Sequence, residues 1–320
     1  MVLYTAEAIL GEPLSDKQAE DLSVLAWLVQ LQTSYILVCD DIVDRSTIRR
    51  GQSTWWCRPE IGQTAVSDAF ILNFCIYYLL KLHFKKHFAY IELVEYFQEN
   101  SFLTEIGQSG DHLIASKGRS NFDGFNMENY DFIITHKGGH FYVMGAMVAL
   151  IYLGHGTPTN VTQILDVALA FGKYAQVQDD FLDAFADPEV TGKVGTDIEE
   201  NKCTWLIIQA LRRCSPQQRE ILQSAYGTDK PEDVAKVKEI YRDLKLDEVY
   251  TEYERKAIAE ITMKINGLDE TEGLKKTVFD IMPGMASSYH SILFDTDVWK
   301  SVKNSGHKSG RATIGEVTSS

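Results

Sequence analysis

Residues 22–44 read LSVLAWLVQLQTSYILVCDDIVD, a long apolar run that ends in a cluster of acids. Leu22, Val29 and Ile36 recur at helical spacing on one stripe, which is interrupted only by the polar Thr33. The run therefore predicts a long helix whose last turn carries aspartates.

The same helical spacing recurs along most of the chain. No stretch shows sustained strand alternation, and only 7 prolines in 320 residues leave few forced helix ends. We expect an all-α fold, a single large helical bundle over residues 1–300. Residues 301–320 hold few large apolar side chains and are expected to form a disordered tail. The further helical stripes run over residues 69–82, 90–103, 127–153, 161–185, 204–213, 234–244 and 247–265.

Charge and cysteine content restrict the class of protein. A formal net charge of −14 argues against general electrostatic binding to nucleic acid or anionic lipid, so a polyanion could bind only through a local basic cluster or through metal ions. The 5 cysteines form no C-x-x-C pair, which favours a reducing compartment, and we expect a cytoplasmic protein. The apolar stretch from Phe141 to Gly154 is too short to span a membrane, so no membrane span is expected. Residues 1–10 read as a helix already under way, and we expect an amino-terminal segment to be missing.

Two D-D-x-x-D motifs carry the chemistry, one with Asp40, Asp41 and Asp44, the other with Asp179, Asp180 and Asp183. At about 100° per residue, three such carboxylates share one face of a helix and repel one another. Mg²⁺ relieves that repulsion, because it prefers oxygen ligands and bridges carboxylates to phosphates. Both motifs therefore predict metal binding at catalytic carboxylates.

Cationic side chains follow each motif. Arg49 and Arg50 stand just beyond the first motif, and Lys193 and Lys202 follow the second. Four cations beside two acidic motifs indicate a single polyphosphate ligand.

These residues resemble the trans-isoprenyl diphosphate synthases, and specifically the animal farnesyl diphosphate synthases. The likeness is carried by DDIVDRSTIRRGQ at residues 40–52, TEIGQSGD at 104–111 and QVQDDFLDAFADPEVTGKVGTDIEENKCTWL at 176–206. It implies an all-α bundle of the isoprenoid and terpene synthase type with a central cavity, and a homodimer. It also implies three Mg²⁺ ions, with Mn²⁺ as an alternative, that ionise an allylic diphosphate.

The resemblance assigns roles residue by residue. Asp111 would join Asp40, Asp41, Asp44, Asp179 and Asp183 as a metal ligand, and Asp180 would complete the catalytic set. The remaining substrate contacts implied by the resemblance would come from Arg49, Arg50, Gln108, Lys137, Gln176, Lys193 and Lys202. Tyr35 and Ile36 lie where the family gauges chain length, while Phe70, Phe74 and Phe141 are candidate cavity aromatics.

Several positions depart from the family pattern for the second substrate, isopentenyl diphosphate. The family has glutamine at the position of Thr33, phenylalanine at that of Ala175, threonine at that of Gly138 and tyrosine at that of Phe141. The pair formed by Gly138 and Gly139 inside a helical run predicts a kink or a close backbone approach. That break resembles one by which class I terpene synthases aim a backbone carbonyl at the cation.

These departures lead to the hypothesis of a class I terpene synthase of the insect type. It would convert farnesyl diphosphate, the preferred substrate, into a sesquiterpene hydrocarbon or alcohol. Geranyl diphosphate is the second candidate substrate. Two alternatives stay open: a prenyltransferase that condenses isopentenyl diphosphate with an allylic diphosphate, and a non-catalytic helical partner subunit.

Overall fold

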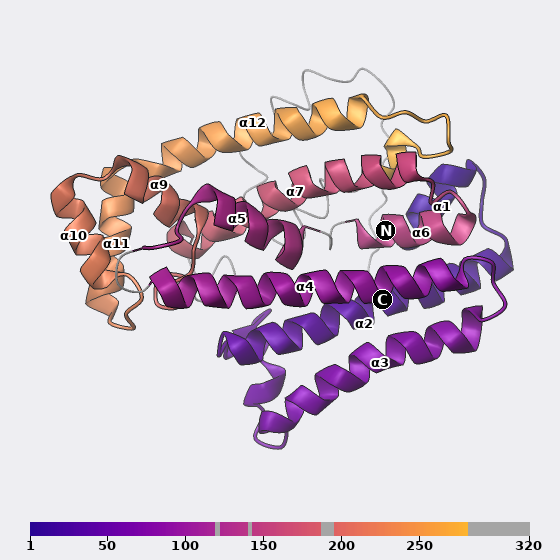
Figure 1. The fold of residues 1–320 in the computed structure, drawn as a ribbon, viewed down its shortest axis with the longest axis horizontal. Helices are drawn as coiled ribbons and strands as arrows, with labels where there is room; N and C mark the ends of the chain where they lie inside the picture. The colour runs from indigo at the N-terminus through magenta and orange to yellow at the C-terminus, as the bar shows by residue number, and fades with distance from the viewer. Residues whose placement is uncertain (119–121, 140–142, 187–194, 281–320) are drawn as a thin grey trace, which may run out of the picture. The chain divides into compact units, whose positions relative to one another are not determined.

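A computed structural model describes residues 1–118, 122–139, 143–186 and 195–280. The predictions for Phe141, Lys193 and the tail 301–320 fall outside these residues. The described part is helical almost throughout, which confirms the all-α prediction (Figure 1). The helices are α1 Val2–Leu10, α2 Asp16–Val43, α3 Ala65–Phe84, α4 Tyr90–Gly118, α5 Met127–Ile133, α6 Met144–Leu153, α7 Pro158–Phe185, α9 Trp205–Arg213, α10 Pro216–Ala225, α11 Pro231–Asp243 and α12 Leu246–Asn266, with short turns η1 Trp55–Cys57, η2 Gly62–Thr64, η3 Ile134–Gly138 and η4 Lys276–Phe279.

Helix α2 is the element that carries the first acidic motif. Ser15 caps its start through a capping box with Gln18, so two backbone N–H groups that lack helical partners are satisfied. Leu22, Leu25 and Leu28 on its inner face are fully buried. The helix packs along α3 and contacts α1, α4 and α6. It therefore holds its acidic end rigidly at one end of the helical layer (Figure 1).

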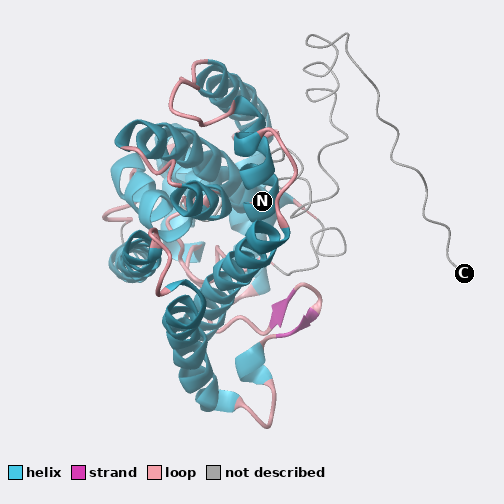
Figure 2. Cartoon of the chain, turned by 90° about the vertical axis from the view of Figure 1, so that its right-hand side faces the viewer, coloured by secondary structure: helices cyan, strands magenta, loops and turns pink. Residues whose placement is uncertain are grey.

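The chain leaves α2 through a short antiparallel hairpin, which the sequence analysis did not predict. Strand β1 (Ile48–Arg49) pairs with β2 (Gln52–Ser53), with Arg49 opposite Gln52 (Figure 2). Arg50 and Gly51 between them have φ values of 53° and 71°. Positive φ at both central residues is typical of a type I′ turn, whose twist matches that of the flanking strands. The hairpin turns the chain back so that Arg49 faces α2.

The predicted helix break at Gly138 and Gly139 coincides with η3, a single π-helical turn after α5. Here the amide of Gly139 donates to the carbonyl of Ile134, five residues back, at 2.8 Å. Glycines on both neighbouring helices let this turn approach closely. A Cβ on Gly107 of α4 would lie 2.3 Å from the nitrogen of Lys137, and one on Gly172 of α7 would lie 2.7 Å from Cα of Gly139. The turn is therefore held between α4 and α7 by backbone contact.

Helices α9–α12 pack around an aromatic core, and α9, α10 and α11 lie at the same end of the bundle as the acidic end of α2 (Figure 1). Trp205, Tyr241 and Tyr250 are buried there, and Phe181 of α7 stacks on Tyr250 with ring centroids 4.0 Å apart. Helix α12 lies along α7 (Figure 1). This packing fixes the half of α7 that carries the second acidic motif.

Two described segments are long and apolar enough to cross a membrane by length and composition alone: residues 16–43 and 62–84. The segment 16–43 was not considered in the sequence-based prediction. Its uncharged run, residues 22–39, is longer than the stretch from Phe141 to Gly154. Helix α2 nevertheless holds the buried acids Asp21 and Asp41 and packs on four other helices. Helices that pack inside a protein can meet the same criterion of length and apolar composition.

Candidate active site

The first acidic motif occupies the last turn of α2. Asp40 and Asp41 belong to the helix, and Asp44 is its C-cap. A helix C-terminus is the negative end of the helix dipole, so three carboxylates there are unfavourable without cations. The structure supplies three cations from different parts of the chain.

Arg49 is the first of these cations. Its Nε donates to Asp41 Oδ1 at 2.8 Å and its Nη2 donates to Asp40 Oδ2 at 3.1 Å. One planar guanidinium thus joins two carboxylates, which an ammonium group cannot reproduce. Its neighbour Arg50 is exposed at the hairpin turn.

Two lysines meet at Asp111 of α4. Lys137 Nζ, from the π-helical turn, lies 2.8 Å from Asp111 Oδ2 and 3.2 Å from Asp40 Oδ1. Lys202 Nζ lies 2.8 Å from Asp44 Oδ1 and 3.2 Å from Asp111 Oδ2. The predicted site residues from α2, α4, η3 and the segment before α9 are therefore brought together.

Burial and charge act in opposite directions on these groups. Burial alone would raise the pKa of Asp40 and Asp111, but the nearby cations, Lys137 foremost, outweigh it and hold both below the usual range. The same carboxylates raise the pKa of Lys137 and Lys202 in spite of burial. At neutral pH, Asp40 and Asp111 are thus ionised beside two protonated lysines.

The second acidic motif does not present all three carboxylates to one face, because Asp180 lies in the core, and the catalytic role predicted for Asp180 stays a prediction. Asp180 is buried and accepts hydrogen bonds from Tyr130 Oη at 2.6 Å, the Trp205 amide at 2.7 Å and Gln176 Nε2 at 3.0 Å. Burial raises the pKa of Asp180 to about 7. Its position in the motif, about 100° from Asp179, turns it into the core, where it joins α5, α7 and α9.

The outer acids of that motif approach the first motif. The carboxylate of Asp179 helps to raise the pKa of Arg49, after Asp41 and Asp40, which places it within electrostatic range of the α2 end. Asp183 accepts from the amides of Thr196 at 3.1 Å and Asp197 at 3.2 Å. The two motifs therefore face a common region, although a backbone loop already engages Asp183.

Glu200 is a site residue that the sequence analysis missed. Its Oε2 lies 3.9 Å from Lys202 Nζ. Burial first, and then the charge of Asp44, raise the pKa of Glu200 to about 7. The only sequence signal was its position two residues before a cation already singled out.

Metal binding at these carboxylates stays a prediction. Within the described ranges, no three His, Cys, Asp or Glu side chains are grouped closely enough to hold a metal ion, because Arg49, Lys137 and Lys202 stand between the carboxylates. The residues present do fit Mg²⁺. All candidate ligands are hard carboxylate oxygens, and Asp40 Oδ1 is a buried oxygen that lies 3.2 Å from Lys137 Nζ.

The cavity residues fall into two groups. Tyr35 and Ile36 are buried on α2, one turn before Asp40. Phe70 and Phe74 are 58% and 65% exposed and stack on each other on the outer face of α3. In this chain the two rings face outward, and their role as cavity residues stays a prediction.

Positions linked to the second substrate show where the family pattern is lost. Thr33 donates its hydroxyl to the carbonyl of Val29 in its own helix at 3.0 Å. Ala175 is buried on α7, and Gly138 leaves space toward Gln176, whose Oε1 would lie 3.9 Å from an added Cβ. Gln108 is half-buried on α4. Of the positions that the resemblance links to the second substrate, Arg50 keeps the expected residue, and it is exposed in the turn of the hairpin.

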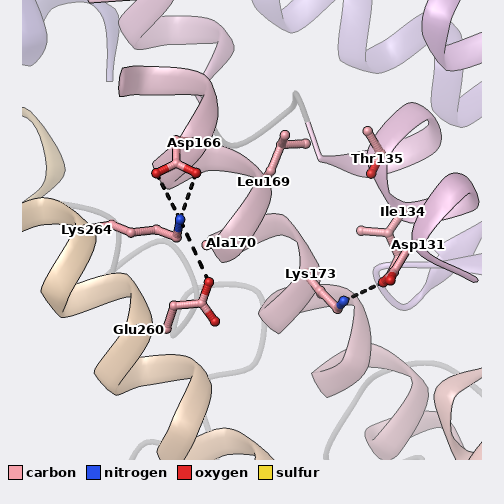
Figure 3. A pocket seen from close by; sticks show the side chains of 9 residues that line it. All are labelled: Asp131, Ile134, Thr135, Asp166, Leu169, Ala170, Lys173, Glu260 and Lys264. Atoms are coloured by element: carbon pink, nitrogen blue, oxygen red, sulfur yellow. Dashed lines mark hydrogen bonds and ion pairs between the residues drawn. The ribbon is translucent and has the colours of Figure 1, made fainter. Parts of the chain in front are cut away.

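A separate hollow of about 210 Å³ lies behind η3, between α7 and α12 (Figure 3). Its lysines are already paired, Lys264 with Asp166 at 2.7 Å and Lys173 with Asp131 at 2.5 Å. Lys137 does not line it. The hollow is therefore distinct from the acidic site and offers no unpaired cation to a phosphate.

Comparison with known proteins identifies the lineage. The chain is 39% identical to the farnesyl pyrophosphate synthase of Schizosaccharomyces pombe, over 88% of this chain and 82% of that protein. It is 38% identical to the enzyme of the same name from Saccharomyces cerevisiae, over 83% and 76%. The solved T. brucei farnesyl diphosphate synthase complexed with risedronate superposes with a TM-score of 0.80 at 27% identity, covering 89% of this chain and 84% of that one.

These relatives contradict the terpene synthase hypothesis, because the similar proteins are named as farnesyl pyrophosphate synthases over most of their length. They favour the alternative, a prenyltransferase. The sequence resemblance itself is confirmed, since the match to the polyprenyl synthetase family runs over residues 1–244. With that match and relatives near 40% identity, the chain belongs to the polyprenyl synthetase family.

Proposed function

We propose that the chain is a Mg²⁺-dependent prenyltransferase that joins isopentenyl diphosphate to an allylic diphosphate, with farnesyl diphosphate as the product. The observation that carries the proposal is the convergence of three cations from separate elements on four carboxylates of α2 and α4. Lys137 and Lys202 share Asp111 and reach Asp40 and Asp44, while Arg49 completes the group. The names of the relatives support the choice of product.

The protein's own groups explain how a diphosphate would be held. Arg49, Lys137 and Lys202 present guanidinium and ammonium donors to phosphate oxygens, and charge-assisted hydrogen bonds of this kind are the stronger ones. Asp40, Asp44, Asp111, Asp179 and Asp183 would hold Mg²⁺, with three ions and the Mn²⁺ alternative as part of the proposal. Bound Mg²⁺ supplies neutralisation of the departing pyrophosphate. Tyr35 and Ile36, one turn deeper on α2, would lie beside the start of the prenyl chain.

The test uses the full chain with isopentenyl and geranyl diphosphates. Farnesyl diphosphate is the expected product in the presence of Mg²⁺, and excess chelator should abolish its formation. Asp44→Asn should lower kcat at least ~10²-fold, because the Mg²⁺ that would neutralise the departing pyrophosphate would lose a carboxylate ligand. Asp243→Asn, an exposed carboxylate on α11, is the matched control and should leave turnover unchanged. Absence of any condensation product with geranyl or dimethylallyl diphosphate would refute the proposal.

The second-substrate positions give the proposal a finer form. With Thr33 bonded to its own helix, Arg50 is the main group left to bind the homoallylic diphosphate. Each missing charge-assisted hydrogen bond weakens binding by about 1.5–3 kcal/mol. We infer a high KM for isopentenyl diphosphate, which Thr33→Gln should lower at least tenfold. An unchanged KM in that variant would show that residue 33 does not contact this substrate.

A homodimer is also part of the proposal. Phe70, Phe74 and Tyr78 form an exposed stripe at four-residue spacing on α3, and Phe102 and Ile106 are exposed on the adjacent α4. Contiguous exposed apolar surface of this kind marks protein interfaces. A second copy of the chain is the proposed occupant.

Sedimentation should give twice the chain mass of 36.2 kDa. Phe74→Glu with Phe102→Glu should shift the protein to the monomer at micromolar concentration. A wild-type protein that sediments as a monomer at high concentration would exclude the dimer. We also propose a cytoplasmic location, which is supported by the cysteines, since all five are free in the described part of the chain.

A further inference from the structure

The connection between α3 and α4, residues 85–89, is held rigidly by aromatic packing. Phe84 is buried and packs edge-on against Tyr152, with centroids 6.3 Å apart. His87 stacks on the same ring at 4.7 Å with an interplanar angle of 6°. Tyr152 in turn donates its hydroxyl to Asp21 of α2 at 3.0 Å. Phe84 and His87 both pack inward and Ala89 is buried, whereas Lys85, Lys86 and Phe88 are exposed.

The outward side chains combine positive charge with apolar surface. Lys81, Lys85 and Lys86 are exposed, Phe88 is 72% exposed and Leu82 is 63% exposed. Within the part of the chain that the structure describes, none of these lysines makes an ion pair or a side-chain hydrogen bond. We call these five residues the basic tip.

The charge of the surrounding sequence sets the basic tip apart. The chain contains 45 acidic residues, yet residues 69–91 include none. Glu92 is the next acid along α4. The basic tip is therefore a local cationic and apolar surface on a protein with a formal net charge of −14, and it is complementary to an anionic surface. Screening over roughly 8 Å at physiological ionic strength limits the influence of distant acids, whereas the exposed Asp16 and Glu20 in the first turns of α2 lie near the tip and offset part of its positive charge.

We propose that the basic tip docks the protein on an anionic membrane surface. Lysines near such a surface are attracted to acidic lipid headgroups, and exposed Phe and Leu side chains insert at the headgroup boundary. A second copy of the chain is disfavoured as the occupant, since three lysines would meet three lysines in a symmetric contact.

The position of the basic tip supports this orientation. It lies beside the first residues of α2, whereas Asp40, Asp41 and Asp44 lie at the other end of that 28-residue helix (Figure 1). A helix of this length spans about 42 Å. Docking through the basic tip therefore keeps the acidic site away from the negative surface.

The experiment is cosedimentation of the full chain with vesicles of phosphatidylcholine, with or without 30% phosphatidylserine. Wild type should bind the anionic vesicles at least tenfold more strongly than the neutral ones, and added salt should weaken that binding. Lys85→Glu with Lys86→Glu should reduce anionic binding at least tenfold, and Phe88→Ser should reduce it several-fold. Arg219→Glu with Lys230→Glu, the same change in charge at exposed positions of α10 and the start of α11, should leave binding unchanged.

Prenyltransferase assays with soluble substrates verify that each variant is folded, because none of these residues belongs to the acidic site. Failure of wild type to bind anionic vesicles would overturn the proposal, as would equal loss in the tip and control variants. If the tip variants instead change the sedimentation mass without changing vesicle binding, the surface contacts a second copy, and the membrane proposal is wrong.

Discussion

Gly107→Ala is the substitution that most directly tests how the π-helical turn positions Lys137. The added methyl would lie 2.3 Å from the backbone nitrogen of Lys137, 2.6 Å from the carbonyl carbon of His136 and 2.7 Å from Cα of Lys137. Ordinary contact begins near 3.4 Å. All three atoms are backbone, so η3 must move away from α4 by about 1 Å, since cores store such overlap as strain.

That displacement has a definite cost at the site. Lys137 Nζ lies 2.8 Å from Asp111 and 3.2 Å from Asp40, and a shift of about 1 Å takes both beyond hydrogen-bond range. Misplacement on this scale costs about 10²-fold in rate, or about 2.7 kcal/mol of transition-state stabilisation. Steady-state kinetics with geranyl and isopentenyl diphosphates should show that loss in kcat/KM.

Gly110→Ala is the matched control, one turn further along α4. Its methyl would lie 2.7 Å from Phe132 Cε1, a side-chain atom of a ring that is 39% exposed and packs on His136, so a side chain and not the backbone must give way. We expect kcat/KM within threefold of wild type. Circular dichroism and melting temperature separate a folded Gly107→Ala protein from an unfolded one. A folded Gly107→Ala enzyme with wild-type kcat/KM would show that close contact between α4 and η3 does not position Lys137.

Three further predictions rest on other contacts. Arg49→Lys should lower kcat/KM 10- to 100-fold with little change in melting, because one ammonium cannot join both Asp40 and Asp41 as the guanidinium does; Arg45→Lys, exposed on the same loop, is the control, and equal kinetics in the two variants would contradict the prediction. Tyr130→Phe should lower the free energy of unfolding by about 1–3 kcal/mol, since Asp180 loses a buried hydrogen bond of 2.6 Å; urea unfolding measures this loss, and a change below about 0.5 kcal/mol would count against it. Burial lowers the pKa of His87 below 6.5, with Lys17 acting in the same direction and Asp21 opposing it, so the stability contributed by neutral His87 is present above about pH 6.5 and is lost as the pH falls below that value. His87→Phe keeps the ring contact and should flatten the fall in urea midpoint between pH 7 and pH 5, and parallel curves would exclude the assignment.

The helices and the first acidic motif were predictable because their signals are local. The apolar stripe of residues 22–36 specifies one face of α2, and the spacing of Asp40 and Asp44 fixes their common side. The two glycines in a helical run likewise predicted the break that the structure contains at η3. Each of these inferences needs only the geometry of a single helix.

The sequence pattern was insufficient where packing against a second helix or loop determines which side chains are buried. Helical spacing put Phe70 and Phe74 on one face of α3, but it could not tell an inner face from an outer one. The hairpin was missed because an Arg-Gly pair lacks the asparagine or aspartate typical of its turn. Asp180 was assigned to catalysis with its neighbours, and only the positions of Tyr130 and Trp205 reveal a structural role.

The function itself was mistaken for the same reason. Substitutions at Thr33, Ala175 and Gly138 change a subsite, and a changed subsite was taken as a changed reaction. The similarity to farnesyl pyrophosphate synthases over most of the chain argues against a changed reaction.

The shared hydrogen bonds at Asp111 also determine how ligands must enter. Four carboxylates, Asp40, Asp41, Asp44 and Asp111, stand against the three cations Arg49, Lys137 and Lys202, and the acids Glu200 and Asp179 lie nearby, so the group is net negative before any ligand arrives. A diphosphate brings several more negative charges, and its entry is opposed unless positive ions come with it. Substrate and divalent ions are therefore expected to bind as one cooperative unit, each raising the affinity of the other by the same factor.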